Sequence, residues 1–90
     1  MKFTRYDNWN QIITTDFLGT FEATYNEVVI AFGDPIIKNG CTTWQFEFEN
    51  GNVGFVILGV RPGNGVVEWD IYGFEAETVN LIQEVLDQYR

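Results

Sequence analysis

The dipeptide Asn50-Gly51 separates two runs of apolar and aromatic residues, and it constrains the fold of this chain more than any other feature. Asn-Gly favours a two-residue type I′ turn, because both central positions of that turn require a positive φ. A hairpin closed on these two residues predicts the following cross-strand pairs: Phe48 with Val53, Phe46 with Phe55, and Trp44 with Ile57. Since strand side chains alternate between two faces, these six side chains are expected to share one face.

A second connection, Arg61-Pro62-Gly63-Asn64-Gly65, is interpreted as a five-residue hairpin loop. It predicts three further pairs: Val60 with Val66, Ile57 with Trp69, and Phe55 with Ile71. Both turns therefore agree on one aromatic face. The stretch 43–72 is predicted to form three antiparallel strands whose core face carries Trp44, Phe46, Phe55, Ile57 and Trp69.

The flanking segments predict one more strand and two helices. Residues 17–23 alternate as a short strand, and Thr24 with Glu27 fits the T-x-x-E capping box that starts a helix. This helix is expected to end at Gly33. Residues 75–90 carry apolar side chains at helical spacing and predict the second helix.

The predicted fold is a single small α+β domain of order β-α-β-β-β-α. Both helices are expected to pack on one face of a mainly antiparallel sheet, because each amphipathic element must bury its apolar side. Residues 1–16 are assigned to an N-terminal arm and residues 17–90 to the domain.

The chain is strongly acidic, with 13 acidic against 5 basic residues and a formal net charge of −8. Proteins that bind nucleic acid neutralise phosphates with Lys and Arg, so direct binding to DNA or RNA is disfavoured. The charge leaves two interpretations open: a solubilising surface, or an acidic face that docks on a basic partner protein. No apolar run approaches the length of a membrane span and no secretory signal is evident, so a cytoplasmic protein without membrane contact is expected.

The chain contains no histidine, which removes the commonest general base and the commonest transition-metal ligand. Cys41 follows Gly40 without a recognisable activating base, so an inert thiol is expected. The run Gly63-Asn64-Gly65 lacks the spacing of a phosphate-binding P-loop. We therefore predict a protein that is not an enzyme and that uses no metal or cofactor.

Two surfaces are candidates for binding. Lys38, Arg61 and Arg90 are expected to lie at one end of the sheet, where they are either solvated cations or an anion site. The reverse face of the sheet is expected to carry an apolar stripe between acidic rims, formed by Val56, Leu58, Glu47, Glu68 and Asp70. Such a face is expected to be covered by the N-terminal arm, by a second copy of the chain or by a partner protein.

Several short elements of the chain resemble a widespread family of small, mostly uncharacterised proteins of tailed bacteriophages. The shared elements are Phe32-Gly33-Asp34-Pro35 as F-G-x-P, then Trp44, Asn50-Gly51 as D/N-G, and Trp69-Asp70-Ile71-Tyr72-Gly73 as W-x-I-x-G. The chain departs from the family at Asp70, where a histidine is usual, and at Ile57 and Leu58, where a polar pair is common.

The resemblance implies an accessory protein that counters host immunity in the cytoplasm of the infected bacterium. By similarity to the phage anti-CBASS sponges, it implies a homo-oligomer that binds and sequesters a small cyclic-nucleotide defence signal without catalysis. On this reading Lys38 and Arg61 are expected to contact phosphate, and Tyr72 or Trp9 to stack on a base.

Two alternatives remain open at this point. The acidic surface could occupy the nucleic-acid groove of a host defence protein, as a DNA mimic of the anti-CRISPR type does. The chain could also be a virion-associated structural module.

Overall fold

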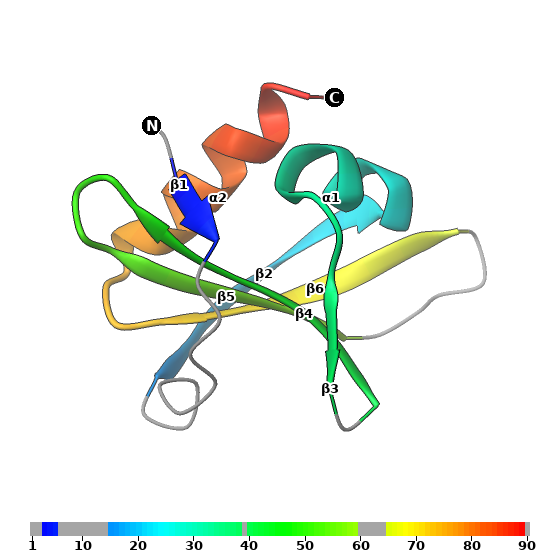
Figure 1. Cartoon of the computed structure of the whole chain (residues 1–90), viewed down its shortest axis with the longest axis horizontal. Helices are drawn as coiled ribbons and strands as arrows, with labels where there is room; N and C mark the ends of the chain where they lie inside the picture. Colours follow the sequence, from blue (N-terminus) through cyan, green and yellow to red (C-terminus); the bar gives the residue numbers. More distant parts are fainter. Residues whose placement is uncertain (1–2, 6–14, 39, 60–64, 90) are drawn as a thin grey trace.

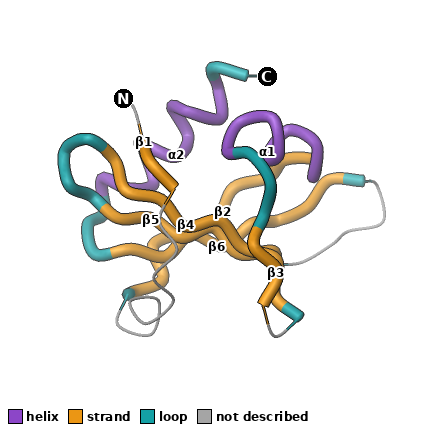
Figure 2. The backbone as a smooth tube through the Cα atoms, in the orientation of Figure 1, coloured by secondary structure: helices purple, strands orange, loops and turns teal. Residues whose placement is uncertain are grey.

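One antiparallel sheet carries the fold, and both helices lie on the same side of it (Figure 1). The computed structural model describes residues 3–5, 15–38, 40–59 and 65–89. The strands are β1 (Phe3–Arg5), β2 (Asp16–Thr24), β3 (Ile36–Lys38), β4 (Cys41–Phe48), β5 (Val53–Leu58) and β6 (Val66–Gly73), and the helices are α1 (Tyr25–Phe32) and α2 (Glu77–Asp87). The predicted α+β class and the placement of both helices on one face are confirmed (Figure 2).

The sheet has the strand order β1-β4-β5-β6-β2, and β3 also pairs with β4. The two strands β1 and β3, of three residues each, were not predicted from the sequence. Because β4 pairs with β5 along one edge, β1 and β3 share its other edge. Residues 3–5 of the predicted arm are therefore a strand of the sheet, and residues 6–14 lie outside the described residues.

Helix α1 begins at the capping box that the sequence predicts. The Glu27 backbone N–H donates to Thr24 Oγ1 at 3.1 Å, and the Thr24 N–H donates to Glu27 Oε1 at 2.8 Å. The helix ends at Gly33, which has a φ of 87° and whose N–H donates to the Val29 carbonyl at 2.7 Å. Eight residues form a marginal helix in isolation, so α1 depends on its contacts with the sheet.

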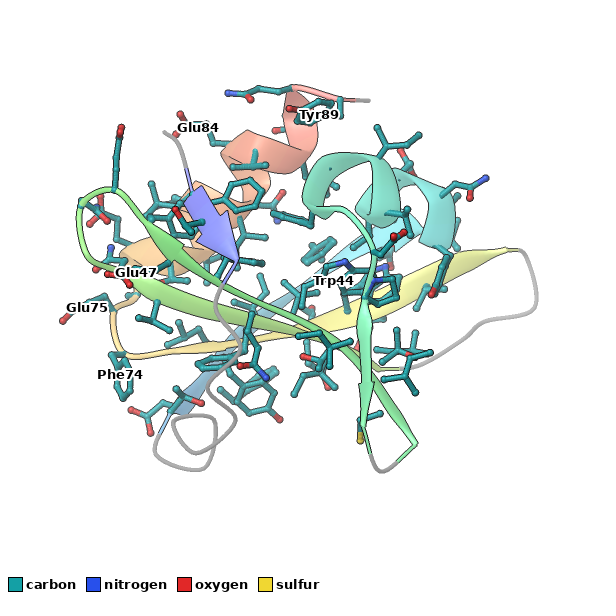
Figure 3. All side chains as sticks on the ribbon, in the orientation of Figure 1. Trp44, Glu47, Phe74, Glu75, Glu84 and Tyr89 are labelled. Atoms are coloured by element: carbon teal, nitrogen blue, oxygen red, sulfur yellow. The ribbon has the colours of Figure 1, made fainter. Side chains whose placement is uncertain are left out.

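Two buried tryptophans provide these contacts at the two ends of α1. Trp69 Nε1 donates to the Ala23 carbonyl at 3.0 Å, just before the helix begins. Trp44 Nε1 donates to the Gly33 carbonyl at 2.7 Å, where the helix ends, and the ring lies between α1 and the sheet (Figure 3). The two indoles meet edge to face, with ring centroids 5.3 Å apart and an interplanar angle of 70°. Both helix ends are thus fixed to the sheet by side chains that are also part of the core.

The core fills the space between the sheet and the two helices. Phe46 stacks on Phe32 of α1 with a centroid distance of 4.9 Å, and Phe3 of β1 packs on both rings. Helix α2 is shorter than the predicted 75–90 and buries one face against this cluster through Thr78, Leu81, Ile82, Val85 and Leu86. Aromatic stacking and apolar burial therefore hold the helices on the sheet.

The register predicted for the central strand is wrong by one residue. The loop between β4 and β5 has three residues instead of two: Gly51 N–H donates to the Phe48 carbonyl at 2.8 Å, and Phe48 N–H donates to the Asn52 carbonyl at 2.7 Å. Gly51, with a φ of 91°, takes the left-handed position of this wider turn. The pairs observed are Thr43–Ile57, Trp44–Val56, Gln45–Phe55, Phe46–Gly54 and Glu47–Val53.

A one-residue change of register moves every side chain of a strand to the opposite face. Val56 and Leu58 therefore face the helices, whereas Phe55 and Ile57 face away from them. The second hairpin is shifted as well, since Leu58 pairs with Trp69 and Val56 with Ile71. The two shifts cancel, so that β4 and β6 present the predicted faces and only β5 is reversed.

Gly54 shows why this register fits the tertiary structure. It lies on the helix side of β5, where a Cβ atom would come within 2.8 Å of Phe46 Cε2 and 3.0 Å of Thr78 Cγ2. These distances are shorter than real Cβ contacts. The absence of a side chain at Gly54 thus allows the first turn of α2 to lie close to the sheet.

Candidate functional site

The sheet face opposite the two helices is the candidate site, and we call it the open face because no helix of the described residues lies over it (Figure 1). By strand alternation and register, it consists of Thr43, Gln45 and Glu47 of β4, Val53, Phe55 and Ile57 of β5, Glu68, Asp70 and Tyr72 of β6, and Phe17, Thr20 and Glu22 of β2.

The open face is buried at its centre and exposed over the outer strands. Thr43, Gln45 and Phe55 are all fully buried. The Thr43 hydroxyl donates to the Val56 carbonyl at 2.9 Å, which satisfies it within the sheet. In contrast, Phe17 of β2 leaves 57% of its surface exposed. The exposed side chains of this face are therefore Phe17, Thr20 and Glu22 of β2 and Glu47 of β4, whereas Glu68, Asp70 and Tyr72 of β6 are half-buried.

An aromatic pair marks this accessible region. Phe17 lies opposite Tyr72 in the register, and their rings meet edge to face with centroids 5.7 Å apart. Phe55 lies on the other side of Tyr72, so the three rings form one row across the sheet. Phe17 is the exposed ring of the three, Tyr72 is half-buried and Phe55 is buried. An exposed aromatic side chain such as Phe17 is typical of contact surfaces for protein or ligand.

Carboxylates gather next to this row, towards the end of the sheet where β5 ends and β6 begins. Glu22 lies directly opposite Glu68 on the neighbouring strand, and Asp70 is two residues further along β6 on the same face. The Asp70 carboxylate lies close to Gly59: a Cβ atom added at Gly59 would be 3.1 Å from Asp70 Oδ1. Three carboxylates therefore lie close together at this end of the open face.

A second acidic region lies at the opposite end of the sheet. Glu47 and Glu49 line a hollow of about 320 Å³ beside β1, together with Phe3, Thr4 and Phe48. Glu47 is exposed at this edge of the sheet (Figure 3). The aromatic row therefore lies between two groups of carboxylates.

The charge of the described residues is almost entirely negative. Every acidic residue except Asp7 lies within the described ranges. Of the cations, Arg5 and Lys38 lie in the described strands β1 and β3, and the others, Lys2, Arg61 and Arg90, fall outside the described residues. The accessible surface over β6 and β2 is thus suited to a positively charged partner.

The predicted ligand-binding residues are only partly described. Tyr72 lies on the open face and is half-buried. Lys38 pairs with Cys41 in the β3–β4 hairpin, at the end of the sheet where β5 also ends. Trp9 and Arg61 lie outside the described residues, so their predicted contacts with base and phosphate stay predictions.

The predicted interface residues separate into two groups. Glu47, Glu68 and Asp70 lie on the open face as predicted. Val56 does not: it is fully buried on the helix side, and Leu58 packs against the same core. The placement of these two residues on the reverse face is corrected, because the three-residue turn reverses β5.

Sequence reasoning missed Phe17 as an open-face residue. The alternation of residues 17–23 groups Phe17 with Phe21 and Ala23, which are core residues. The structure shows a register irregularity between Phe17 and Gly19. The extra residue, Leu18, packs against the core, and Phe17 turns to the open face beside Tyr72.

Other functional signals are sparse among the described residues. No three His, Cys, Asp or Glu side chains within the described ranges are grouped so that they could hold a metal ion. Cys41 is an exposed free thiol. Neither α1 nor α2 has the length and apolar character needed to cross a membrane.

Comparison with known proteins gives no relative from which a site could be transferred. The chain matches no protein-family model, no curated protein and no solved structure. The open face is therefore interpreted from its own residues.

Proposed function

We propose that this chain is a non-enzymatic binding protein whose open face docks on a basic surface of a partner protein. The observation that carries the proposal is the group Glu22, Glu68 and Asp70 beside the Phe17–Tyr72 pair, of which Phe17 is exposed. In the cytoplasm of a phage-infected bacterium, the partner would be a defence protein that binds nucleic acid, and the acidic face would occupy its phosphate-binding groove.

The arrangement of the face supports docking more than solubility. Charges that only solubilise a protein can be spread so that they repel one another little. Here Glu22 and Glu68 lie directly opposite each other on neighbouring strands, so negative charge is concentrated at one end of the face. A partner rich in Lys and Arg is attracted by this concentration of carboxylates and therefore associates faster.

Apolar and aromatic side chains of the open face supply the contact area that charges alone do not. Buried interfacial area comes mainly from apolar and aromatic side chains, with charged groups at the rim. Phe17, Tyr72 and Ile57 offer such a centre, and the carboxylates lie at its border. Arg is the cation best matched to this surface, since its guanidinium stacks on rings and binds carboxylates in two-pronged fashion.

Displacement of nucleic acid tests the proposal. The chain is added to a panel of purified CRISPR effector complexes, and the release of labelled DNA is followed by fluorescence anisotropy. We expect release from at least one effector, with an affinity that falls steeply as salt increases. No displacement from any effector of the panel at 50 mM salt would refute the proposal in this form.

A charge-matched pair of variants identifies the face. The double reversal Glu68→Lys with Asp70→Lys should abolish displacement. The control, Glu75→Lys with Glu84→Lys, changes the net charge equally at exposed positions around α2, away from the open face (Figure 3). The control should retain displacement; equal loss in both variants would mean that only the net charge matters.

The Phe17–Tyr72 pair, with Phe17 exposed, also favours a second candidate, the sequestration of a cyclic nucleotide by a homo-oligomer. Aromatic rings stack on any nucleobase, with about 1–3 kcal/mol per base. Calorimetry against cyclic di- and trinucleotides and cyclic ADP-ribose types tests this candidate, with Tyr72→Ala as the variant that should lose binding. Sedimentation of the free protein as a monomer, with no heat from any nucleotide, would exclude it.

A further inference from the structure

The turn between β4 and β5 carries the dipeptide Asn50-Gly51 at the surface, and both residues are exposed. Asparagine followed by glycine is the dipeptide most prone to deamidation, because glycine has no side chain to hinder the approach of its backbone nitrogen to the asparagine amide. Exposure leaves Asn50 accessible to water and base. The local geometry of the turn therefore decides whether this residue reacts.

Deamidation needs only water as a co-reactant. The Gly51 nitrogen loses its proton and attacks Cγ of Asn50, a new C–N bond forms, and the bond from Cγ to Nδ2 breaks. The amide nitrogen leaves as ammonia, which carries the proton away, and a cyclic succinimide remains. Water then opens either carbonyl of this ring and gives aspartate or isoaspartate, with no oxidation or reduction.

Two hydrogen bonds hold the reacting groups of this pair. The Gly51 N–H, which includes the attacking nitrogen, donates to the Phe48 carbonyl at 2.8 Å. Asn50 Oδ1 accepts from the Asn52 N–H at 3.1 Å, and this bond fixes the side-chain amide that would be attacked. Each reacting group is thus held in place by a partner of its own.

The backbone of the turn also keeps the two groups apart. A three-residue hairpin loop is usually a type I turn followed by a left-handed residue, which is the position of Gly51. In such a turn Asn50 takes the second central position, with a ψ of about 0°. The Gly51 nitrogen is then eclipsed with the Asn50 nitrogen, whereas ring closure needs it eclipsed with Asn50 Cβ. The backbone therefore has to rotate at Asn50 before the reaction can begin.

A contact with α2 adds to the closure of the turn. Asn52 Nδ2 donates to Glu77 Oε2 at 3.3 Å, and Glu77 lies in the first turn of α2. The Phe48 N–H donates to the Asn52 carbonyl at 2.7 Å, which joins the same residue to β4. Asn52 therefore couples the turn to the tertiary structure.

We propose that Asn50 is a deamidation site that the folded turn keeps unreactive, so that it reacts only when the turn opens locally. Local openings of this kind cost less free energy than global unfolding. Each conversion adds one carboxylate beside Glu49, which lines the hollow next to β1. Isoaspartate also lengthens the backbone of the turn, which changes the spacing on which the bond from Gly51 to Phe48 depends. Opening of the turn is thus converted into a lasting change of charge and backbone.

The test follows deamidation by peptide mapping and mass spectrometry, in native buffer and in guanidinium chloride at the same pH and temperature. Asn39-Gly40 and Asn64-Gly65 have the same dipeptide and provide internal references, which should react as fast as Asn50 in the denaturant. We expect Asn50 to react about tenfold more slowly in the native protein, since opening breaks two hydrogen bonds. Equal rates of Asn50 in both solvents would overturn the inference.

Hydrogen exchange at the Gly51 amide measures the opening of the turn independently, because this N–H donates to the Phe48 carbonyl. We expect its exchange to be slowed by a factor similar to the slowing of deamidation at Asn50. Slow deamidation together with an unprotected Gly51 amide would overturn the role of turn opening.

A matched set of variants tests the contact with α2. Asn52→Ala and Glu77→Ala each remove the same hydrogen bond and should raise the native deamidation rate of Asn50 about two- to fivefold. The double variant should react at the same rate as either single variant, because the bond is lost only once. The control, Glu75→Ala, removes an exposed carboxylate just before α2 and should leave the rate unchanged. Unchanged rates in both single variants would contradict the contribution of α2.

Discussion

The hydroxyl of Thr78 offers the sharpest test of the packing between α2 and the sheet. Thr78 is fully buried in the first turn of α2, and its Oγ1 has no hydrogen-bond partner among the described residues. Its methyl group lies against the backbone of Gly54 and Gly73, at 3.0 and 3.4 Å from the positions that their Cβ atoms would take. The methyl group of Thr78 thus fills the space beside the two glycines, while its hydroxyl makes no hydrogen bond among the described residues.

An unsatisfied buried hydroxyl costs about 1–3 kcal/mol, and valine has nearly the same shape without it. Threonine and valine also have similar helix propensities. We therefore expect Thr78→Val to raise the free energy of unfolding by about 1 kcal/mol. For a domain of this size, that gain corresponds to a rise in Tm of roughly 4–8 °C.

Thr43 provides the matched control. It is equally buried, but its Oγ1 donates to the Val56 carbonyl at 2.9 Å. Thr43→Val removes this hydrogen bond and should lower the free energy of unfolding by about 1 kcal/mol. Urea denaturation followed by fluorescence measures both variants. The reasoning is refuted if Thr78→Val destabilises the protein as much as Thr43→Val does.

Two further substitutions test the helix–sheet contact and the start of α1. Gly54→Ala should lower stability by about 1–3 kcal/mol because its methyl would overlap Phe46, whereas Gly19→Ala, with its nearest neighbour at 3.7 Å, should change stability by less than about 0.5 kcal/mol in thermal melts. Thr24→Ala should cost about 1 kcal/mol by removing the acceptor of the Glu27 N–H, which circular dichroism melts would detect; an unchanged Tm would mean that tertiary contacts alone position the helix.

Local signals in the sequence were sufficient for the elements that depend on local chemistry. The capping box at Thr24 and the stop at Gly33 define α1, and both appear in the structure. The alternation of Trp44, Phe46 and Phe48 with polar residues places β4 correctly, as does that of Trp69 and Ile71 in β6. In these strands the pattern itself distinguishes the two faces.

The register of β5 could not be predicted in the same way. Asn50-Gly51 fits both a two-residue turn and the three-residue turn observed, because Gly51 supplies the positive φ in either case. Residues 53–58 are apolar on both faces, so their pattern does not choose between the two registers. The choice is made by the approach of α2 to Gly54, which is a long-range contact.

The contrast between strands with clear alternation and β5 also explains which residues of the candidate site were predicted on the correct face. Glu47, Glu68 and Asp70 lie on clearly alternating strands and were placed correctly, whereas Val56 and Leu58 on β5 were not. Phe17 was missed because an irregularity in β2 breaks the alternation. Such irregularities depend on the pairing strand and leave little trace in the residues themselves.

The edge-to-face pair of Trp44 and Trp69 has an optical consequence. Two indoles with centroids 5.3 Å apart couple their electronic transitions, so their circular dichroism depends on the angle between the rings. Each ring is also tied to one end of α1 by its Nε1 hydrogen bond. The domain therefore contains a built-in chromophore pair that reports whether the helix is attached to the sheet. Detachment of α1 from the sheet can be followed through it without any label.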